Sequence, residues 1–376
     1  MSTPTFSPGL AGVTAGVTAI SEVDADRNKL TYRGYDVHDL VEHTKFDEVA
    51  HLMLLGKLPT KAELDAFIAR TAAQREVSPA VYELFRKFPA DANCMDVLRA
   101  GVAIEALFDP DAHKDTPEAH LQKSLRLYAK IPTLVVNGYR ILKGMEPVKP
   151  SPTLPHSENF WHMLAGGAPN EFFVTTVDAT QILYAEHGFN ASTFASRVTV
   201  STLSDIYSGT VSAIGTLKGN LHGGANEAAM EMLLEIGEAT KADAYIRDAL
   251  AKKKKIMGFG HREYKHGDER AKIVKTFVVE LSKRLNEPKW LEISNIVEGV
   301  MLKEKNLYPN LDFPVASSYY MMKLPVELYT PIFVMSRITG WCAHMMEQLA
   351  NNRIIRPHNE YNGPKGLTVP PISARK

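Results

Sequence analysis

The sequence has few cysteines and no long apolar stretch. Its 376 residues include only Cys94 and Cys342, too few for a disulfide framework and without metal-ligand spacing, so a reducing cytosol is expected. No uninterrupted apolar run approaches the roughly 18 to 20 residues that cross a bilayer. The first basic residue is Arg27, so neither a signal peptide nor a transit peptide is expected before it. We expect a cytoplasmic protein that binds no membrane.

An excess of charge of one sign is also absent. Lys and Arg together number 43, as do Asp and Glu, so no overall field attracts the chain to nucleic acid or to an anionic membrane. Hydrophobic residues make up 45% of the chain and charged residues 23%, which is typical of a globular protein with a sizeable core. For 376 residues, two domains are expected.

Most segments have the apolar spacing of α-helices, and alternating strand patterns are scarce. Two such helical patterns are Ala225, Ala229, Leu233 and Ile236, and Ile338, Cys342, Met345 and Leu349. Strands are predicted only near the amino terminus, around residues 12–20 and 30–33, with a turn at 33–35. The predicted fold class is therefore mainly α.

Turn-forming residues divide the chain. Residues 217–220 precede a helix-rich block that Pro309 and Pro325 close about a hundred residues later. We expect this block, residues 218–320, to be a smaller domain inserted into a larger one. The larger domain would consist of residues 1–217 and 321–376, and would be discontinuous in sequence.

The first candidate for chemistry is His222, in the run Leu-His-Gly-Gly-Ala-Asn (221–226) that leads into a predicted helix. The glycines allow a ligand to approach closely, and Asn226 is a candidate N-cap. Near the positive end of a helix dipole a histidine favours its neutral form, which donates a hydrogen bond to a developing oxyanion. An incidental histidine at a glycine-rich helix start is the more common meaning of so short a motif.

The second candidate combines four lysines (252–255), the run Ile-Met-Gly-Phe-Gly-His-Arg (256–262), Lys265 and Arg270. Cations beside a glycine turn suit a ligand with several phosphates, because lysine supplies charge and glycine exposes backbone N–H groups. Glu263 occupies the last glycine position of a dinucleotide-binding fingerprint, so that fold is not expected. The alternatives are a solvated lysine face and a structural role for His261.

The third candidate is Asp312, in the run Pro-Asn-Leu-Asp-Phe-Pro (309–314). Partial burial among apolar neighbours raises the pKa of a carboxyl group above roughly 3.9 and makes it a stronger base. Such a base removes a carbon-bound proton only when an electrophile assists at the substrate carbonyl. A turn aspartate is the alternative.

Together these motifs resemble the citrate synthase family, in particular the short bacterial enzymes that include 2-methylcitrate synthases. The similarity covers nearly the whole chain, from Gly-Leu-Ala-Gly-Val (9–13) and Tyr-Arg-Gly-Tyr-Asp (32–36), through Glu-His-Gly-Phe-Asn-Ala-Ser-Thr-Phe (186–194), to Ile-Arg-Pro (355–357). Motifs of this length in this order are highly specific. The resemblance implies a two-domain helical fold.

The resemblance also implies a reaction, the condensation of a short acyl-CoA with oxaloacetate. Asp312 resembles the base that removes the α-proton of the acyl-CoA, and His222 resembles the donor to the thioester carbonyl as it becomes an enol or enolate. His261 resembles the acid that protonates the oxaloacetate carbonyl. Water then hydrolyses the thioester and releases CoA, and no metal or other cofactor is implied.

Binding residues follow from the same resemblance. Oxaloacetate is a dianion, which arginines grip in bidentate geometry. The implied oxaloacetate contacts are His187, Asn190, Arg270, Phe333, Arg337 and Arg356. The last arginine reaches the neighbouring active site in family dimers, so a homodimer is implied, with Arg356 acting in trans. The implied CoA contacts are Lys252, Lys253, Lys254, Ile256, Gly258, Arg262 and Lys265.

The chain departs from the family pattern at a few positions. Glu263 stands where an apolar residue is common, Glu269 stands where proline is common, and Asn220 is also unusual. Acids that face the pocket would repel a polyanionic substrate. In the family pattern oxaloacetate binds first, and the smaller domain then closes to exclude water.

Acetyl-CoA and propionyl-CoA differ by one methylene, which an apolar pocket distinguishes by only about 1 to 3 kcal/mol. Residues 319–322 and 326–331 are somewhat closer to the 2-methylcitrate enzymes, so we expect a citrate synthase with appreciable propionyl-CoA activity. A dedicated 2-methylcitrate synthase is the alternative. A helical protein that binds CoA or dicarboxylates without turnover is an alternative of another class, and the complete His222, His261 and Asp312 set disfavours it. Histidine spacing gives no support to a metal site.

Overall fold

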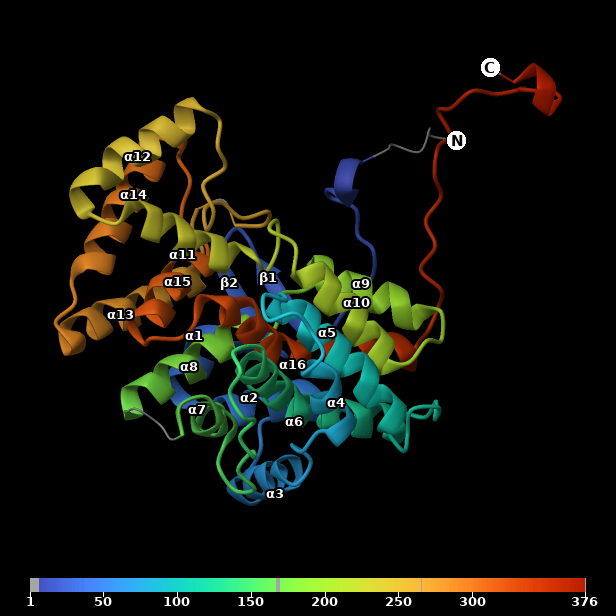
Figure 1. Ribbon diagram of the computed structural model, residues 1–376, viewed down its shortest axis with the longest axis horizontal. Helices are drawn as coiled ribbons and strands as arrows, with labels where there is room; N and C mark the ends of the chain where they lie inside the picture. Colours follow the sequence, from blue (N-terminus) through green and yellow to red (C-terminus); the bar gives the residue numbers. More distant parts are fainter. Residues whose placement is uncertain (1–6, 167–169, 265, 376) are drawn as a thin grey trace.

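The computed structural model describes residues 7–166, 170–264 and 266–375. Helices dominate it, as Figure 1 shows, and the mainly α prediction is confirmed. The strands are β1 (Ser21–Asp24), β2 (Lys29–Tyr32) and β3 (Tyr35–Asp36), which form one antiparallel sheet in that order. Among the described residues, no helix is long and apolar enough to cross a membrane.

The α-helices of the first half of the chain are α1 (Val37–His43), α2 (Phe46–Leu55), α3 (Lys61–Ala72), α4 (Pro79–Phe85), α5 (Cys94–Glu105), α6 (Pro117–Leu142), α7 (His156–Ala165), α8 (Glu171–Tyr184), α9 (Ala191–Ser201) and α10 (Ile206–Leu217). Those of the second half are α11 (Ala225–Ile236), α12 (Ala239–Ala251), α13 (Glu269–Leu285), α14 (Lys289–Lys305), α15 (Asp312–Met321) and α16 (Tyr329–Ala350). Short 3₁₀ helices are η1 (Pro8–Leu10), η2 (Ala106–Phe108), η3 (Val326–Leu328) and η4 (Ile372–Ala374).

The core is organised around α16. Every residue of this helix from Tyr329 to Met345 is buried, which is the pattern of a helix surrounded by protein rather than lying on a surface. Helices α2, α6, α8, α9 and α10 pack against it. Two of its buried residues, Arg337 and His344, are ionisable, so each needs a partner inside the protein.

Helices α11 to α15 pack mainly on one another. Contacts join α12 to α14, α13 to α15, and α11 to α15, and the group lies together at one side of the molecule in Figure 1. The helical pattern predicted from Ala225 to Ile236 is confirmed as α11, and the one from Ile338 to Leu349 is confirmed within α16.

The strand prediction was right for one segment and wrong for the other. Residues 30–33 largely coincide with β2, and Arg33 and Gly34 take positive φ values of 47° and 89° in the turn to β3. Residues 12–20 form no strand. Val17 in this segment is 86% exposed, and the backbone N–H of Ala19 donates to the Glu347 carboxylate (2.9 Å) instead of to a neighbouring strand. Alternating residues need a partner strand to become a sheet, and the fold provides none here.

Candidate active site

Two loops meet beside α15 and bring two of the predicted catalytic residues together. The Asn310 N–H donates to the Gly258 carbonyl (2.9 Å), and the Gly260 N–H donates to the Tyr308 carbonyl (2.9 Å). A β-bridge joins residues 259 and 309 between these bonds. His261 follows directly after the first loop and Asp312 directly after the second. The pairing therefore places both side chains at one edge of the same cavity.

Gly258 is required by this arrangement. Its φ is +80°, and a Cβ atom there would lie 2.8 Å from the Cβ of Phe313, on the helix that begins with Asp312. A larger residue would push the loop away from α15.

The cavity has a volume of about 1090 Å³, which is large for a small-molecule site. Residues from many elements line it, including the N-terminal segment. Most of the residues that the sequence singled out are among them, namely His187, Asn190, His222, Ile256, Gly258, His261, Arg262, Arg270, Asp312, Phe333 and Arg337.

His222 lies in the turn before α11, with its ring held from one side. The Ser192 N–H donates to its Nε2 (3.3 Å), and the Ser192 Oγ lies 2.8 Å from the same atom. Because Nε2 accepts from a backbone N–H, the proton of the neutral ring belongs on Nδ1. Burial, with a contribution from the charge of Arg337, lowers the pKa of His222 to about 3. The ring is therefore a neutral hydrogen-bond donor at physiological pH.

The N-cap of α11 differs from the prediction. The helix begins at Ala225, and Gly224 occupies the N-cap position, whereas Asn226 was expected there. The Asn226 Oδ1 accepts from the Glu227 N–H (2.7 Å) and from the Thr330 hydroxyl (3.3 Å). Asn226 is fully buried against η3 and α16, so its side chain joins two helices instead of capping one.

His261 has the opposite tautomer. Its Nδ1 accepts from the N–H groups of Glu263 (3.1 Å) and Tyr264 (3.3 Å), which leaves the proton on Nε2. Burial and the charge of Arg270 lower the pKa of His261 to about 4. His261 is therefore a second neutral hydrogen-bond donor that lines the same cavity.

Asp312 is the first residue of α15 and is half-buried. Burial raises its pKa to about 6, while the hydroxyl of Tyr184, which donates to Oδ1 (2.7 Å), works in the opposite direction. The direction of this shift was expected from the apolar neighbours of Asp312. Tyr184 was not singled out from the sequence, since it lies 128 residues away in the chain.

Arg270 is held by an aspartate. Its Nε and Nη2 donate to the two oxygens of Asp268 (3.0 and 2.8 Å), and Asp268 also accepts from the N–H of Leu311 (3.1 Å). Burial lowers the pKa of Arg270, but the Asp268 charge outweighs burial and keeps it above its ordinary value. Asp268 therefore ties the guanidinium to the start of α15. The sequence signal for it was an acid two residues before a candidate anion-binding arginine.

Arg337 projects from the central helix towards the cavity. Its Nε donates to the Tyr184 carbonyl (2.6 Å), and its Nη1 is buried with no hydrogen-bond partner among the described residues. Burial lowers the pKa of this arginine to about 10, so it stays charged at neutral pH. A buried, charged N–H group without a partner is costly, and an anionic ligand would satisfy it.

His187 and Asn190 lie on the loop between α8 and α9. Asn190 is the N-cap of α9, and its Oδ1 accepts from the Thr193 N–H (3.2 Å). Burial and the charge of Arg270 lower the pKa of His187 well below its ordinary value. Phe333, one turn before Arg337 on α16, packs against Tyr184 with ring centroids 3.9 Å apart and the rings tilted by 34°.

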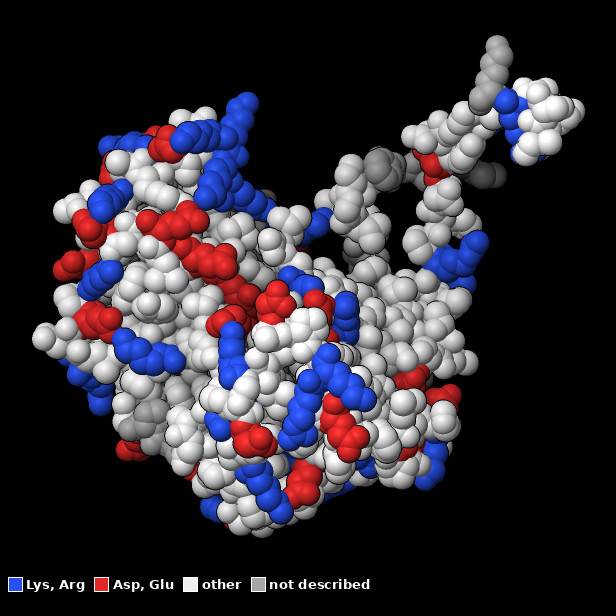
Figure 2. Space-filling view, viewed as in Figure 1, with Lys and Arg blue, Asp and Glu red and all other residues white. Residues whose placement is uncertain are grey.

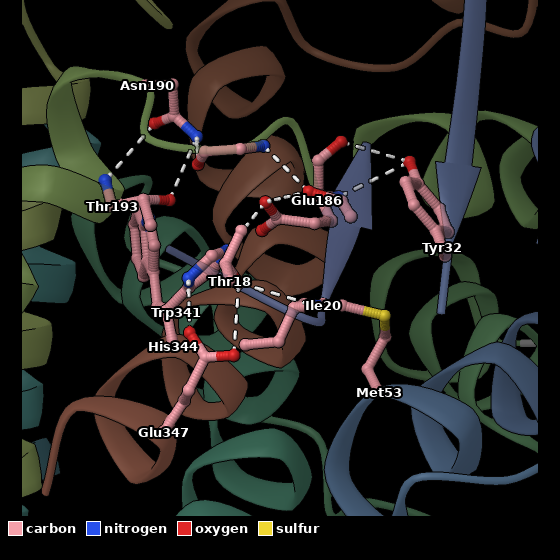
Figure 3. Close-up of polar contacts among 12 residues, drawn as sticks. Thr18, Ile20, Tyr32, Met53, Glu186, Asn190, Thr193, Trp341, His344 and Glu347 are labelled. Atoms are coloured by element: carbon pink, nitrogen blue, oxygen red, sulfur yellow. Dashed lines mark hydrogen bonds and ion pairs between the residues drawn. The ribbon is translucent and has the colours of Figure 1, made fainter. Parts of the chain in front are cut away.

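A buried polar network that the sequence did not reveal supports this loop. Figure 3 shows Glu186, which directly precedes His187, beside His344 of α16 and near Glu347. The His344 Nε2 donates to the Glu186 Oε1 (2.8 Å), and Glu347 accepts from the Thr18 hydroxyl (3.2 Å). Two residues of α16, one turn apart, thereby anchor both the loop and the N-terminal segment.

The predicted CoA contacts divide into two groups. Ile256, Gly258 and Arg262 line the cavity, and Arg262 also donates to the Gly9 carbonyl (2.9 Å). Lys252, Lys253 and Lys254 are exposed and do not line it, whereas Lys255 does. Figure 2 shows basic side chains gathered beside α12, next to an acidic band over α11. Lys265 lies outside the described residues.

The remaining residues that the sequence singled out differ in whether they line the cavity. Arg356 is exposed in the segment after α16, which runs away from the helical body in Figure 1, and it does not line the cavity. Of the two unusual acids, Glu263 lines the cavity, whereas Glu269 does not and pairs with Lys272 (2.8 Å). Among the described residues, no group of three or more His, Cys, Asp or Glu side chains is arranged to hold a metal ion.

Comparisons with known proteins show which family the chain resembles over nearly its whole length. Residues 9–358 match the family model "Citrate synthase, C-terminal domain". The chain is 46% identical over 360 residues to a citrate synthase of Mycolicibacterium smegmatis, with 96% of each chain covered. It is 45% identical over 367 residues to a 2-methylcitrate synthase of Mycobacterium tuberculosis, covering 98% of this chain and 93% of the relative.

Solved structures show the same similarity. A citrate synthase from Thermoplasma acidophilum, in a ternary complex with carboxymethyl coenzyme A and oxaloacetate, superimposes with a TM-score of 0.94 and 32% identity, covering 99% of this chain and all of the other. The sequence similarity and the shared fold both extend over nearly the whole chain. This protein therefore belongs to the citrate synthase family.

Proposed function

We propose that this protein condenses a short acyl-CoA with oxaloacetate and water to give citrate or 2-methylcitrate and free CoA. The observation that supports the proposal best is the arrangement of three groups around one cavity. Asp312 has a carboxyl group with a raised pKa, and His222 and His261 are neutral rings with opposite tautomers. A base and two donors are what enolisation followed by carbonyl attack requires.

In this mechanism Asp312 removes the α-proton of the acyl-CoA. The Nδ1–H of His222 donates to the thioester oxygen as negative charge develops there, and the Nε2–H of His261 passes a proton to the carbonyl oxygen of oxaloacetate as carbon attacks. Water then cleaves the thioester. No metal or other cofactor takes part in the proposed chemistry.

Oxaloacetate would bind at the buried end of the cavity. Arg270 and Arg337 supply two guanidinium groups for its carboxylates, and His187, Asn190 and Phe333 complete the pocket. The Nη1 of Arg337 supports this assignment, because a carboxylate would supply the acceptor that the described residues do not provide.

The acyl-CoA would enter from the exposed end. Ile256, Gly258 and Arg262 would contact the nucleotide, and Lys252, Lys253, Lys254 and Lys265 would supply positive charge for its phosphates. Residues 218–320 would form the domain that closes over this end after oxaloacetate has bound. A cytoplasmic location is part of the same proposal.

The position of Arg356 supports a homodimer. The residue is exposed on a segment that extends from the body, away from the cavity of its own chain. We expect it to bind oxaloacetate in the partner's site. Arg356→Ala should weaken oxaloacetate binding, and mixed dimers with Asp312→Ala should regain activity, because one site of the mixed dimer then keeps both residues. Mixed dimers without regained activity would rule out action in trans.

The first test is CoA release from acetyl-CoA and from propionyl-CoA, each with and without oxaloacetate. We expect release only when oxaloacetate is present, and the ratio of the two kcat/KM values separates a citrate synthase from a 2-methylcitrate synthase. Tight binding of oxaloacetate without release of CoA from either thioester would contradict the proposed reaction and favour a binding protein.

A further inference from the structure

Tyr264 lies among three groups that the proposed function places around oxaloacetate. Its hydroxyl oxygen is 3.2 Å from the Nε2 of His187. Its ring packs on His261 with centroids 4.7 Å apart, and the guanidinium carbon of Arg270 lies 5.9 Å from the ring centroid on another side. The residue is 5% exposed, so these contacts are made inside the protein.

The two histidines come from distant parts of the chain. His187 follows α8, whereas His261 follows the loop that pairs with residues 308–310, and their rings meet edge to face with centroids 4.8 Å apart. Tyr264 contacts both of them. Its backbone N–H also donates to the Nδ1 of His261, so this residue acts on the acid through its backbone as well as its ring.

The chemistry of the side chain suits such a role. Burial raises the pKa of Tyr264 to about 12, so the hydroxyl keeps its proton and can pair with either tautomer of His187. The ring covers one side of His261, and burial favours the neutral form of that imidazole. A buried residue that only filled space would need neither the hydroxyl nor the contact with Arg270.

We propose that Tyr264 is a positioning residue whose hydroxyl orients His187 for oxaloacetate and whose ring holds His261 against the reacting carbonyl, an inference that rests on the proposed function. The two parts of the side chain therefore have separable tasks. The hydroxyl contributes to substrate binding, and the ring contributes to turnover.

Tyr264→Phe and Tyr264→Leu test the two tasks separately. Tyr264→Phe removes one hydrogen bond and keeps the ring, so the Kd for oxaloacetate, measured by calorimetry, should rise about 3- to 10-fold while kcat changes less than about 3-fold. Tyr264→Leu removes the ring as well, so kcat should fall at least about 10-fold below that of Tyr264→Phe. Tyr82→Phe is the matched control, since its hydroxyl accepts from Asn137 (2.9 Å) and lies outside the cavity.

The proposal is overturned if Tyr264→Phe binds oxaloacetate as tightly as the unchanged protein, or if the folded Leu variant has the same kcat as the Phe variant. Circular dichroism establishes whether Tyr264→Leu folds, and if it does not, the binding result for Tyr264→Phe decides alone. Calorimetry needs no turnover. A protein that binds oxaloacetate but releases no CoA would contradict the proposed reaction, while weaker binding by Tyr264→Phe would still support the role at His187.

Discussion

The basic side chains at the two ends of the cavity differ in burial and in the contacts that orient them. At the proposed oxaloacetate end Arg270 and Arg337 are 5% and 2% exposed. Asp268 holds the first guanidinium, and the Tyr184 carbonyl holds the second. Beside the proposed CoA end Lys252 and Lys254 are exposed, and each pairs with a surface acid. A buried charge must be oriented by the fold, whereas exposed charges act mainly through their number and are screened by salt. Single changes should therefore matter far more at the first end than at the second.

The largest effect is expected where the two ends meet, at Asp312. Asp312→Ala removes the proposed base, so kcat should fall about 10³-fold or more. Oxaloacetate binding should change little, because the proposed base acts on the other substrate. Steady-state CoA release and calorimetry provide the two readouts. Turnover near that of the unchanged protein would show that another group is the base.

Arg337→Lys tests the buried end. Lysine keeps the charge but lacks the planar fork, so it cannot donate to the Tyr184 carbonyl and to a carboxylate in the same geometry. We expect oxaloacetate to bind about 10- to 100-fold more weakly, as measured by calorimetry. Arg247→Lys is the control, since Arg247 is exposed, pairs with Asp243 and Glu304 and does not line the cavity, and it should leave binding unchanged.

Tyr184→Phe tests how the Tyr184 hydroxyl affects the pKa of Asp312. The hydroxyl stabilises the charged form of Asp312, so its removal should raise a pKa that is already about 6. Activity needs the ionised carboxylate and is lost as the pH falls through this pKa. The acid limb of the kcat/KM profile for the acyl-CoA should therefore move to higher pH by about one unit. A limb that stays in place would exclude Asp312 as the titrating group.

The smallest effect is expected at the exposed end, from Glu263. Its carboxylate lines the cavity where a polyanionic substrate would bind, whereas that of Glu269 does not. Glu263→Gln should lower KM for the acyl-CoA about 2- to 3-fold at low ionic strength, and added salt should reduce the difference. Glu269→Gln should leave KM unchanged. Equal effects of the two substitutions would mean that net charge, not position, controls affinity.

Sequence motifs were most informative where the chemistry is local. His222, His261 and Asp312 each belong to a short run whose glycines or prolines shape the backbone around them, and all three line the cavity. The motifs did not reveal the supporting residues. Tyr184 reaches Asp312 across 128 residues of chain, and His344 reaches Glu186 across 158. Residues this far apart in the chain do not belong to one short motif, so the sequence does not show that they are partners.

The two wrong predictions have the same origin. Residues 12–20 alternate like a strand, and Asn226 lies near the start of an apolar helical pattern, where an N-cap is common. In the folded protein residues 12–20 form no strand. The Asn226 side chain accepts a hydrogen bond from the Thr330 hydroxyl instead of capping the helix. In both places tertiary contacts outweighed the local conformational preference of the sequence.

The sequence by itself determined the mainly α class, the family, and the identity of the groups that carry the proposed chemistry, because these depend on composition, on helical periodicity and on motifs within a few residues. Only the tertiary structure decided which nitrogen of His222 and of His261 holds the proton, that the Nη1 of Arg337 has no partner among the described residues, and that Glu263, unlike Glu269, lines the cavity. Those properties depend on burial and on hydrogen bonds between distant segments, and these arise only when α16 and the paired loops pack together.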